Sequence, residues 1–231
     1  MKAGVVVFPG SNCDQDLVDA LQIIGYKKVV KLWHKNTDLE DCDQIFIPGG
    51  FSYGDYLRSG AIARFSPIMK ALVRFAEQGG FLMGICNGFQ ILTEAGLLPG
   101  ALLRNNNQQF ICDYTWITPA FNHGTQAIHT GDQKAFQIPI AHGEGRYYAP
   151  DHLLTEMETY EQILFRYCTE SGQVTKEANP NGSVGNIAGV TNRSKNVFGM
   201  MPHPERVVDE RLGATDGKTI FEYLFHFTGQ L

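Results

Sequence analysis

The sequence predicts an α/β fold in which helices cover both faces of a mostly parallel central sheet. Short and almost wholly apolar segments, typical of buried parallel strands, alternate with segments whose apolar residues recur at helical spacing. The first, third and fourth of these strands each end at a segment that contains glycine. Functional loops of such folds gather at the carboxyl ends of parallel strands. We therefore expect one common crevice to be formed by Pro9–Gly10, Gly49–Gly50 and Cys86.

The elements are predicted in chain order. Strands are expected at residues 2–8, 28–32, 44–47, 81–85, 110–118, 136–142, 162–167 and 197–201. Helices are expected where apolar residues share one face: Leu17, Leu21 and Ile24; residues 62–78, interrupted near Pro67; Phe89, Ile91, Leu92 and Ala95; and Ile220, Phe221, Leu224 and Phe225. Residues 96–195 suggest a mixed extension of the sheet with long loops, and residues 151–178 hold no motif that we can interpret.

Length and composition limit the function. A chain of 231 residues is long enough for one well-buried domain, so we expect residues 1–231 to form a single domain. The net charge is −5, with acidic residues dispersed, which argues against nucleic acid or an anionic membrane as partner. The N-terminal apolar run is too short for a signal peptide, and no segment reaches about 18 apolar residues. We expect a soluble, cytoplasmic protein.

The central motif is G-I-C-N-G at residues 84–88, where the apolar strand 81–85 ends at Cys86 and a helical pattern follows. Two glycines flank Cys86 as they flank the serine of a G-x-S-x-G nucleophile elbow, which allows a sharp turn. Such a turn places the sulfur at the N-terminus of a helix, whose dipole stabilises the reactive thiolate. An isolated cysteine is more often an ordinary core residue. Its glycine frame favours a nucleophile here.

A cysteine nucleophile normally needs a histidine that is held by a third group. Two H-x-E arrangements occur, His142 with Glu144 and His203 with Glu205. In an extended segment residues i and i+2 point the same way, so either glutamate could orient its histidine, and spacing alone does not choose between the pairs. Context favours His203 and Glu205, because prolines on both sides of His203 rigidify the segment.

Two other kinds of site are disfavoured. The glycine-rich loop at residues 48–56 lacks the G-K-[ST] ending of a phosphate-binding P-loop, and no G-x-G-x-x-G opens a helix after the first strand. The loop is either a simple turn or the donor of a Gly50 amide to an oxyanion shared with the Asn87 amide. Without H-E-x-x-H, C-x-x-C or P-C-x-x-C patterns, we expect no disulfide framework and no metal site.

Three motifs follow one another in the chain: a Pro-Gly-Gly loop, a G-I-C-N-G-F-Q elbow and a late P-H-P-E segment. Their order resembles that of the class I, triad-type glutamine amidotransferases, whose fold is flavodoxin-like. More narrowly, the chain looks like the glutaminase subunits of phosphoribosylformylglycinamidine synthase, the PurQ family. The residues that carry this resemblance are spread over the full length: 8–14, 48–61, 141–146, 179–183 and 199–206.

The resemblance implies hydrolysis of the side-chain amide of glutamine. It makes Cys86 the nucleophile, His203 the general base and then acid, and Glu205 the orienting carboxylate. The amides of Gly50 and Asn87 would form the oxyanion hole. The α-carboxylate and α-amino groups of the substrate would be held by Gln90 and by the loop at Ala141–His142.

The resemblance also implies partners. The ammonia would pass to a PurL-type synthetase subunit, which uses ATP and magnesium to convert formylglycinamide ribonucleotide to formylglycinamidine ribonucleotide in de novo purine biosynthesis. A PurS-type small subunit would bridge the two. No cofactor is expected on this chain itself, which is short and has no ATP motif.

Two other functions remain in competition. One is a stand-alone cysteine amidohydrolase of the same fold, such as a γ-glutamyl hydrolase, which would turn over its substrate without a partner. The other is a non-catalytic scaffolding subunit. The joint presence of Cys86, His203 and Glu205 speaks against a scaffold, because a subunit that had lost its chemistry would be expected to lack one of them.

Overall fold

The computed structural model describes residues 1–120 and 135–227, and within them the chain builds one nine-stranded sheet and one two-stranded sheet. Five strands of the large sheet run parallel, in the order β2 (Lys28–Trp33), β1 (Lys2–Val7), β3 (Gln44–Ile47), β4 (Phe81–Ile85) and β11 (Val197–Met200). Antiparallel pairs then extend it through β10 (Ile187–Thr191), β9 (Ile163–Cys168), β6 (Ile111–Pro119) and β7 (Phe136–His142).

The predicted fold class is confirmed. The order β2-β1-β3-β4 is that of flavodoxin-like folds, in which the site lies outside the carboxyl ends of the parallel strands. The predicted mixed extension of the sheet also exists as the four strands β10, β9, β6 and β7 among the described residues.

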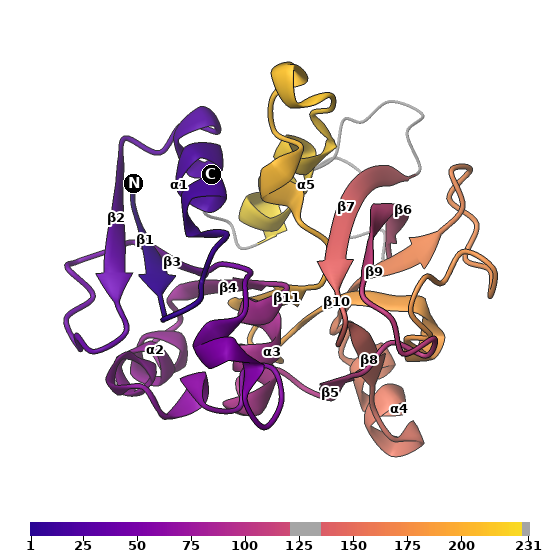
Figure 1. Cartoon of the computed structure of the whole chain (residues 1–231), viewed down its shortest axis with the longest axis horizontal. Coiled ribbons are helices and arrows are strands. Elements are labelled where there is room, and N and C mark those ends of the chain that lie inside the picture. Colours follow the sequence, from indigo (N-terminus) through magenta and orange to yellow (C-terminus); the bar gives the residue numbers. More distant parts are fainter. Residues whose placement is uncertain (121–134, 228–231) are drawn as a thin grey trace.

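Helices cover both faces of the sheet, as Figure 1 shows. On one face lie α1 (Asp14–Ile23) and α5 (Asp216–Phe227), and on the other lie α2 (Pro67–Glu77) and α3 (Asn87–Glu94). Beyond α3 the two-stranded sheet pairs β5 (Ala101–Leu103) with β8 (Arg146–Tyr148), beside α4 (Asp151–Thr159). Short 3₁₀ turns complete the described chain: η1 (Ser52–Asp55), η2 (Ala63–Phe65), η3 (Val184–Asn186), η4 (Pro204–Arg206) and η5 (Glu210–Leu212).

The core beneath the elbow is densely aromatic. Every residue of β3 and β4 is buried, which explains their continuous apolar sequence. The ring of Phe81 packs against Phe46 and Phe198 at centroid distances of 5.6 and 5.2 Å. Burial of one phenylalanine side chain contributes roughly 1.5–3 kcal/mol. The strand that delivers Cys86 is therefore held on both sides.

The predicted interruption at Pro67 is confirmed and has a local cause. Residues Ala63–Phe65 form the separate turn η2, and α2 begins at Pro67 itself. Proline suits the first turn of a helix because its missing N–H is not needed there and its φ is already helical.

The sequence did not reveal β10, β5, β8 or α4. The pairing of β10 with β9 contains register shifts, and Gly189 lies within the strand, so no alternating pattern marks it. In α4 the described burial is limited to Met157, which leaves the helix without a wide apolar face. Residues 151–178 thus contain α4 and β9 rather than an uninterpretable stretch.

The three loop ends that the sequence placed at one crevice meet in the structure, and of their residues Gly50 and Cys86 line a common cavity. Phe51 N–H donates to Gly10 O at 2.8 Å and Tyr53 N–H to Pro9 O at 2.7 Å, which joins the loops after β1 and β3. A side chain at Gly49 would lie 3.4 Å from Cys86 Cβ, so the third loop end meets the other two. Among the described residues, none of the helices combines the length and apolarity that a membrane crossing requires.

Candidate active site

Cys86 sits on a sharp turn between β4 and α3. Its backbone has φ 50° and ψ −106°, a conformation that side chains rarely adopt and that active sites retain at a cost of order 1–3 kcal/mol. The flanking glycines are needed for space: a Cβ at Gly84 would lie 2.5 Å from Gly88 C, and one at Gly88 would lie 2.0 Å from Ile47 O. The N-terminus of α3 therefore packs directly on the end of β3, and the predicted elbow is present.

His203 and Glu205 form a buried pair. The Nδ1–H of His203 donates to Glu205 Oε1 at 2.6 Å, and the two side chains are 1% and 0% exposed. The expected extended segment is wrong, because Pro204–Arg206 forms the 3₁₀ turn η4. The turn still brings the carboxylate back to the ring. Such a bond fixes the orientation of the imidazole and the nitrogen that carries its proton.

The imidazole of His203 adjoins Cys86. A side chain at Gly49 would lie 2.7 Å from His203 Cε1 and 3.4 Å from Cys86 Cβ, so both groups border the same small space. Burial by itself lowers the pKa of His203, but the charges of Glu205 and Cys86 and hydrogen bonding to both raise it to about 10. Near pH 7 the His203 ring is therefore protonated, and it lies beside the Cys86 sulfur at the N-terminus of α3. The Cys86 thiol also approaches Ala141 O, at 3.7 Å.

A second cysteine, Cys13, lies near Cys86, but its sulfur contacts an arginine. Cys13 Sγ accepts from Arg206 Nη2 at 3.1 Å, and Arg206 Nε lies 3.4 Å from Asp16 Oδ2. Burial raises the pKa of the Cys13 thiol to about 12, although the charge of Arg206 acts in the opposite direction. Cys13 is therefore a protonated core residue at neutral pH, whereas Cys86 stands at a helix N-terminus beside the histidine.

The other H-x-E arrangement does not form a dyad. His142 Nδ1 pairs with Asn105 Oδ1 at 3.1 Å, while the Glu144 carboxylate accepts from Ser59 N–H at 3.2 Å and faces Arg104 at 3.6 Å. Burial, together with the charge of His203, lowers the pKa of His142 to about 4. His142 is consequently neutral near pH 7, and no carboxylate orients it.

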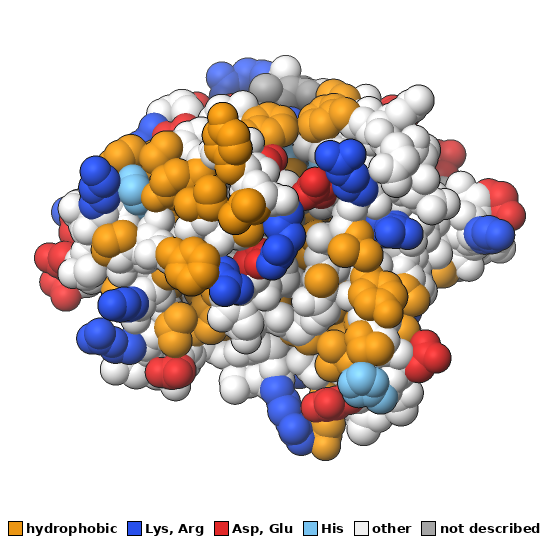
Figure 2. Space-filling view, turned by 60° about the horizontal axis from the view of Figure 1, so that its bottom comes forward, with side chains coloured by type: hydrophobic (Ala, Val, Ile, Leu, Met, Phe, Trp, Pro, Cys, Tyr) orange, Lys and Arg blue, Asp and Glu red, His pale blue; other side chains and the backbone are white. Residues whose placement is uncertain are grey.

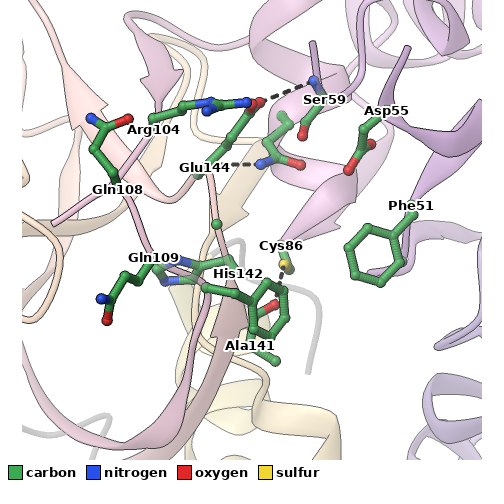
Figure 3. A pocket seen from close by; sticks show the side chains of 14 residues that line it. Phe51, Asp55, Ser59, Cys86, Arg104, Gln108, Gln109, Ala141, His142 and Glu144 are labelled. Atoms are coloured by element: carbon green, nitrogen blue, oxygen red, sulfur yellow. Dashed lines mark hydrogen bonds and ion pairs between the residues drawn. The ribbon is translucent and has the colours of Figure 1, made fainter. Parts of the chain in front are cut away.

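Cys86 opens onto a cavity of about 280 Å³, just below the roughly 300–1,000 Å³ usual for ligand sites. Figure 3 shows Cys86 on its wall, with Phe51 on one side and His142 and Gln109 on the other. Gln90 also lines the cavity, and its Nε2 donates to Glu144 O at 2.6 Å. The structure thus brings Gln90 and His142, both expected to hold substrate, to the same cavity as Cys86.

The two residues whose amides are expected in the oxyanion hole lie close to Cys86, Gly50 in the lining of the same cavity and Asn87 as the next residue in the chain. Gly50 lines the cavity with φ 138°, and a Cβ there would lie 2.6 Å from Gly10 O, so only glycine fits. Asn87 is the first residue of α3, where helix amides lack an intrahelical acceptor. Its side chain has a different role, because Oδ1 accepts from Ser52 N–H at 3.1 Å and Nδ2 donates to Asp55 Oδ1 at 3.3 Å.

Most residues of the cavity were not singled out as site residues from the sequence, although Glu144 was weighed there as the partner of His142. The others come from the loop after β3, the loop after β5 and the start of the loop after β7, which are far apart in the sequence: Phe51, Asp55, Ser59, Arg104, Gln108, Gln109, Phe110 and Gly143. Burial raises the pKa of Asp55 to about 6; hydrogen bonds from Ser59 and Asn87 oppose this, and the charge of Glu144 adds to it. Asp55 and Glu144 give the cavity acidic groups, and Arg104, 3.6 Å from Glu144, gives it a basic one, which suits a ligand that carries both a positive and a negative group.

Residues 1–216 match the CobB/CobQ-like glutamine amidotransferase domain. The chain is 56% identical to the phosphoribosylformylglycinamidine synthase subunit PurQ of Chlorobium chlorochromatii, over 96% of this chain and 95% of that protein. It is 54% identical to the subunit of the same name from Koribacter versatilis, over 96% of each. The chain belongs to the PurQ family of glutamine amidotransferases. The resemblance inferred from the motifs is therefore confirmed.

A solved structure agrees with this membership in the PurQ family. The chain superposes on one from the structure of PurLQS from Thermotoga maritima with a TM-score of 0.83, at 43% identity and 98% coverage of both chains. The similarity in three dimensions thus extends over both the parallel and the antiparallel parts of the sheet.

Proposed function

We propose that this chain is the glutaminase subunit of phosphoribosylformylglycinamidine synthase. It hydrolyses glutamine to glutamate and ammonia and supplies the ammonia to an ATP-dependent synthetase subunit. That subunit converts formylglycinamide ribonucleotide to formylglycinamidine ribonucleotide in de novo purine biosynthesis. The observation that carries this function is the 56% identity to a PurQ subunit over nearly the whole of both chains.

In the first half of the reaction, the Cys86 thiolate attacks the amide carbon of glutamine. The negative charge that forms on the amide oxygen is stabilised by the N–H groups of Gly50 and Asn87. The pKa of His203 is raised to about 10, so its imidazolium is populated and donates a proton from Nε2 to the leaving nitrogen. The C–N bond breaks, ammonia departs, and a γ-glutamyl thioester remains on Cys86.

In the second half, neutral His203 takes a proton from a water molecule, which attacks the thioester carbon. The C–S bond breaks, glutamate leaves, and the thiolate and imidazolium are restored. Glu205 holds the ring through Nδ1 during both proton transfers, as the 2.6 Å bond to it permits. Gln90 and His142 hold the α-amino and α-carboxylate groups, which keeps the amide carbon in front of the sulfur.

The remaining parts of the proposal concern the setting of this reaction. The partners are a PurL-type synthetase subunit and a PurS-type small subunit, in accord with the PurLQS complex of Thermotoga maritima. The chain needs no cofactor of its own, and ATP and magnesium bind to the synthetase subunit. The chain acts as a single glutamine amidotransferase domain, residues 1–231, in the cytoplasm.

A labelling experiment tests the site and the substrate together. The full chain is exposed to a diazoketone analogue of glutamine, with and without the synthetase and small subunits, and the modified peptide is identified by mass spectrometry. We expect labelling at Cys86 alone, protection by glutamine, and faster labelling with the partners. Equal labelling of several cysteines, indifferent to glutamine, would contradict the proposed function.

A further inference from the structure

Three polar side chains meet behind the loop that follows β3 and carries Gly50. The Tyr53 hydroxyl lies 2.8 Å from His34 Nδ1 and 2.9 Å from Ser66 Oγ. His34 follows β2 and Ser66 precedes α2, so the hydroxyl joins three segments that are far apart in the sequence. A tyrosine hydroxyl has one hydrogen to donate and lone pairs with which to accept. It therefore donates to one of these partners and accepts from the other.

Each of the three residues departs from its local preference. Tyr53 has φ 54° and ψ 26°, a left-handed conformation that is uncommon for a residue other than glycine. Ser66 is the N-cap residue of α2, where a serine hydroxyl usually binds a helix amide, but its side chain makes no such bond. His34 is only 4% exposed, and its Nε2 has no hydrogen-bond partner among the described residues. Proteins retain such departures mainly at functional sites, where the surrounding structure holds them in place.

The segment that Tyr53 anchors carries the Gly50 amide. On the inner side of this segment, Ser52 N–H donates to Asn87 Oδ1 at 3.1 Å. On the outer side the attachment is the Tyr53 hydroxyl. The backbone between them closes a tight turn, in which Gly54 N–H donates to the carbonyl three residues earlier at 2.8 Å. Because the turn is short and is held from both sides, its position depends on both attachments, and the position of Gly50 depends on the turn.

The neighbours of Tyr53 in the sequence face solvent instead. Tyr56 and Leu57 are 74% and 89% exposed, whereas Tyr53 is half-buried and packs against the core. Figure 2 shows hydrophobic side chains exposed, among Lys and Arg side chains, on the side of the molecule that contains α2. The inward turn of the Tyr53 hydroxyl is therefore not a general property of this region, which supports a specific role for it.

We propose that Tyr53 is a positioning residue for the oxyanion hole. Held by His34 and Ser66, its hydroxyl keeps the turn in the place where the Gly50 N–H faces the oxygen that becomes negative during attack by Cys86. Such donors stabilise the charge because they are already aimed at that oxygen before the charge develops. Tyr53 is not among the residues that line the cavity, so it acts through the backbone. The inference rests on the proposed function, because it requires acyl transfer at Cys86.

The test compares Tyr53→Phe with a matched control, Tyr26→Phe. Each variant removes one hydroxyl that is hydrogen-bonded within the protein, since the Tyr26 hydroxyl binds the Gln44 side chain at the opposite, amino end of the parallel strands. Ser66→Ala and the double variant Tyr53→Phe/Ser66→Ala complete a double-mutant cycle. Each full-length variant is assembled with saturating synthetase and small subunits, and kcat and KM for glutamine hydrolysis are measured. Circular dichroism and urea unfolding establish that each variant is folded.

A second measurement separates the oxyanion hole from the nucleophile. Iodoacetamide alkylates Cys86 at its methylene carbon: the C–S bond forms, the C–I bond breaks and iodide leaves, so no oxyanion arises. The rate of this reaction therefore reports the reactivity of the thiolate alone. Peptide mapping assigns the product to Cys86, because the exposed Cys112 can react as well.

We expect Tyr53→Phe to lower kcat about tenfold and to leave KM within about twofold. A displaced donor loses only part of the roughly 10²–10³-fold that removal of an oxyanion donor costs. Ser66→Ala should also lower kcat, and the double variant should be no worse than Tyr53→Phe, since both changes break one network. Tyr26→Phe should keep the wild-type kcat. Alkylation of Cys86 should proceed at the wild-type rate in every variant.

The contrary results separate the inference from the proposed function. Tyr53 does not position the oxyanion hole if Tyr53→Phe raises only KM, lowers kcat no more than Tyr26→Phe does, or slows alkylation of Cys86 as much as turnover. Additive effects of Tyr53→Phe and Ser66→Ala on kcat would also overturn the inference, because the two hydroxyls would then act independently. In all these cases the proposed function stands. If the wild-type complex does not hydrolyse glutamine, the proposed function fails and the positioning role with it.

Discussion

The parallel and antiparallel parts of the sheet contribute differently to the site. The parallel part, from β2 to β11, carries the proposed nucleophile and the proposed base: Cys86 follows β4 and His203 follows β11, two strands that pair side by side. The antiparallel part supplies a wall, with Ala141 and His142 at the end of β7. The residues proposed to react therefore lie where adjacent parallel strands end, whereas the antiparallel extension shapes the cavity.

Two histidines make this contrast concrete. His203, after the parallel strand β11, is held by a carboxylate and its pKa is raised to about 10. His142, at the end of the antiparallel strand β7, is held by the neutral amide of Asn105 and its pKa is lowered to about 4. Near pH 7 one ring is charged and the other is neutral. The same local H-x-E sequence therefore gives two electrostatic roles.

The largest expected effect comes from removing the nucleophile of the parallel part. Cys86→Ala should lower glutamine-dependent synthesis at least about 10⁴-fold, because no other group can form the thioester. Ammonia-dependent synthesis by the partner should be retained, which controls for assembly of the complex. Loss of both reactions would mean that Cys86 acts in structure or at an interface. Steady-state assays with each nitrogen source measure this.

The next largest effect is expected from replacing each of the two histidines in turn. His203→Asn should lower glutaminase kcat by roughly 10³-fold, because the general base and acid is lost. His142→Asn should act mainly on KM, by about tenfold, since this neutral ring borders the cavity without a carboxylate partner. Steady-state kinetics of the assembled complex separate the two. Equal losses of kcat in both variants would contradict the assignment of His203 as the base.

A pair of glycine substitutions compares how tightly the two parts are packed. Gly88→Ala should destabilise the fold by about 3 kcal/mol or more, because the new Cβ would lie 2.0 Å from Ile47 O. Gly143→Ala, in the loop after β7, should cost less than about 0.5 kcal/mol, because its nearest neighbour would be Phe110 Cδ2 at 3.8 Å. Urea unfolding measures both, and a stable Gly88→Ala variant would refute the close approach of α3 to β3.

The last comparison is the dependence of stability on pH. The folded pKa of His203 is raised from 6.5 to about 10, so its stabilisation is complete below pH 6.5 and is lost as the pH rises to about 10. Glu205→Gln removes a main cause of the raised pKa. The difference between the urea midpoints of wild type and Glu205→Gln should therefore be largest below pH 6.5 and shrink toward pH 10.

His142→Gln provides the opposite control for this pH dependence. Because the folded pKa of His142 is lowered to about 4, the wild type loses stability as the pH falls from 6.5 to 4, and the variant should lose less.

A difference in urea midpoint between wild type and Glu205→Gln that is the same from pH 6 to pH 10 would show that the charge of His203 does not titrate with folding.

The sequence by itself determined the parallel part of the molecule and the sharp turn at Cys86. Strands 44–47 and 81–85 are buried on both faces, so their apolar runs are continuous. Gly84 and Gly88 leave the space that the sharp turn at Cys86 requires. These signals are readable because strand, turn and helix are each specified by residues next to one another. The Pro67 break in the second helix is readable for the same reason.

Only the tertiary structure decided how the groups around the nucleophile are used. Two H-x-E arrangements have identical spacing, and the prolines beside His203 favoured that pair from the sequence. Only the structure shows what the other pair does: His142 binds Asn105, while Glu144 binds Ser59 N–H and faces Arg104. The cavity residues from the loops after β3 and β5 likewise meet across contacts far apart in sequence. Hydrogen bonds and charges depend on proximity in space, which no local pattern encodes. The chain therefore specifies the turn that holds Cys86 locally, and the groups around Cys86 through the fold.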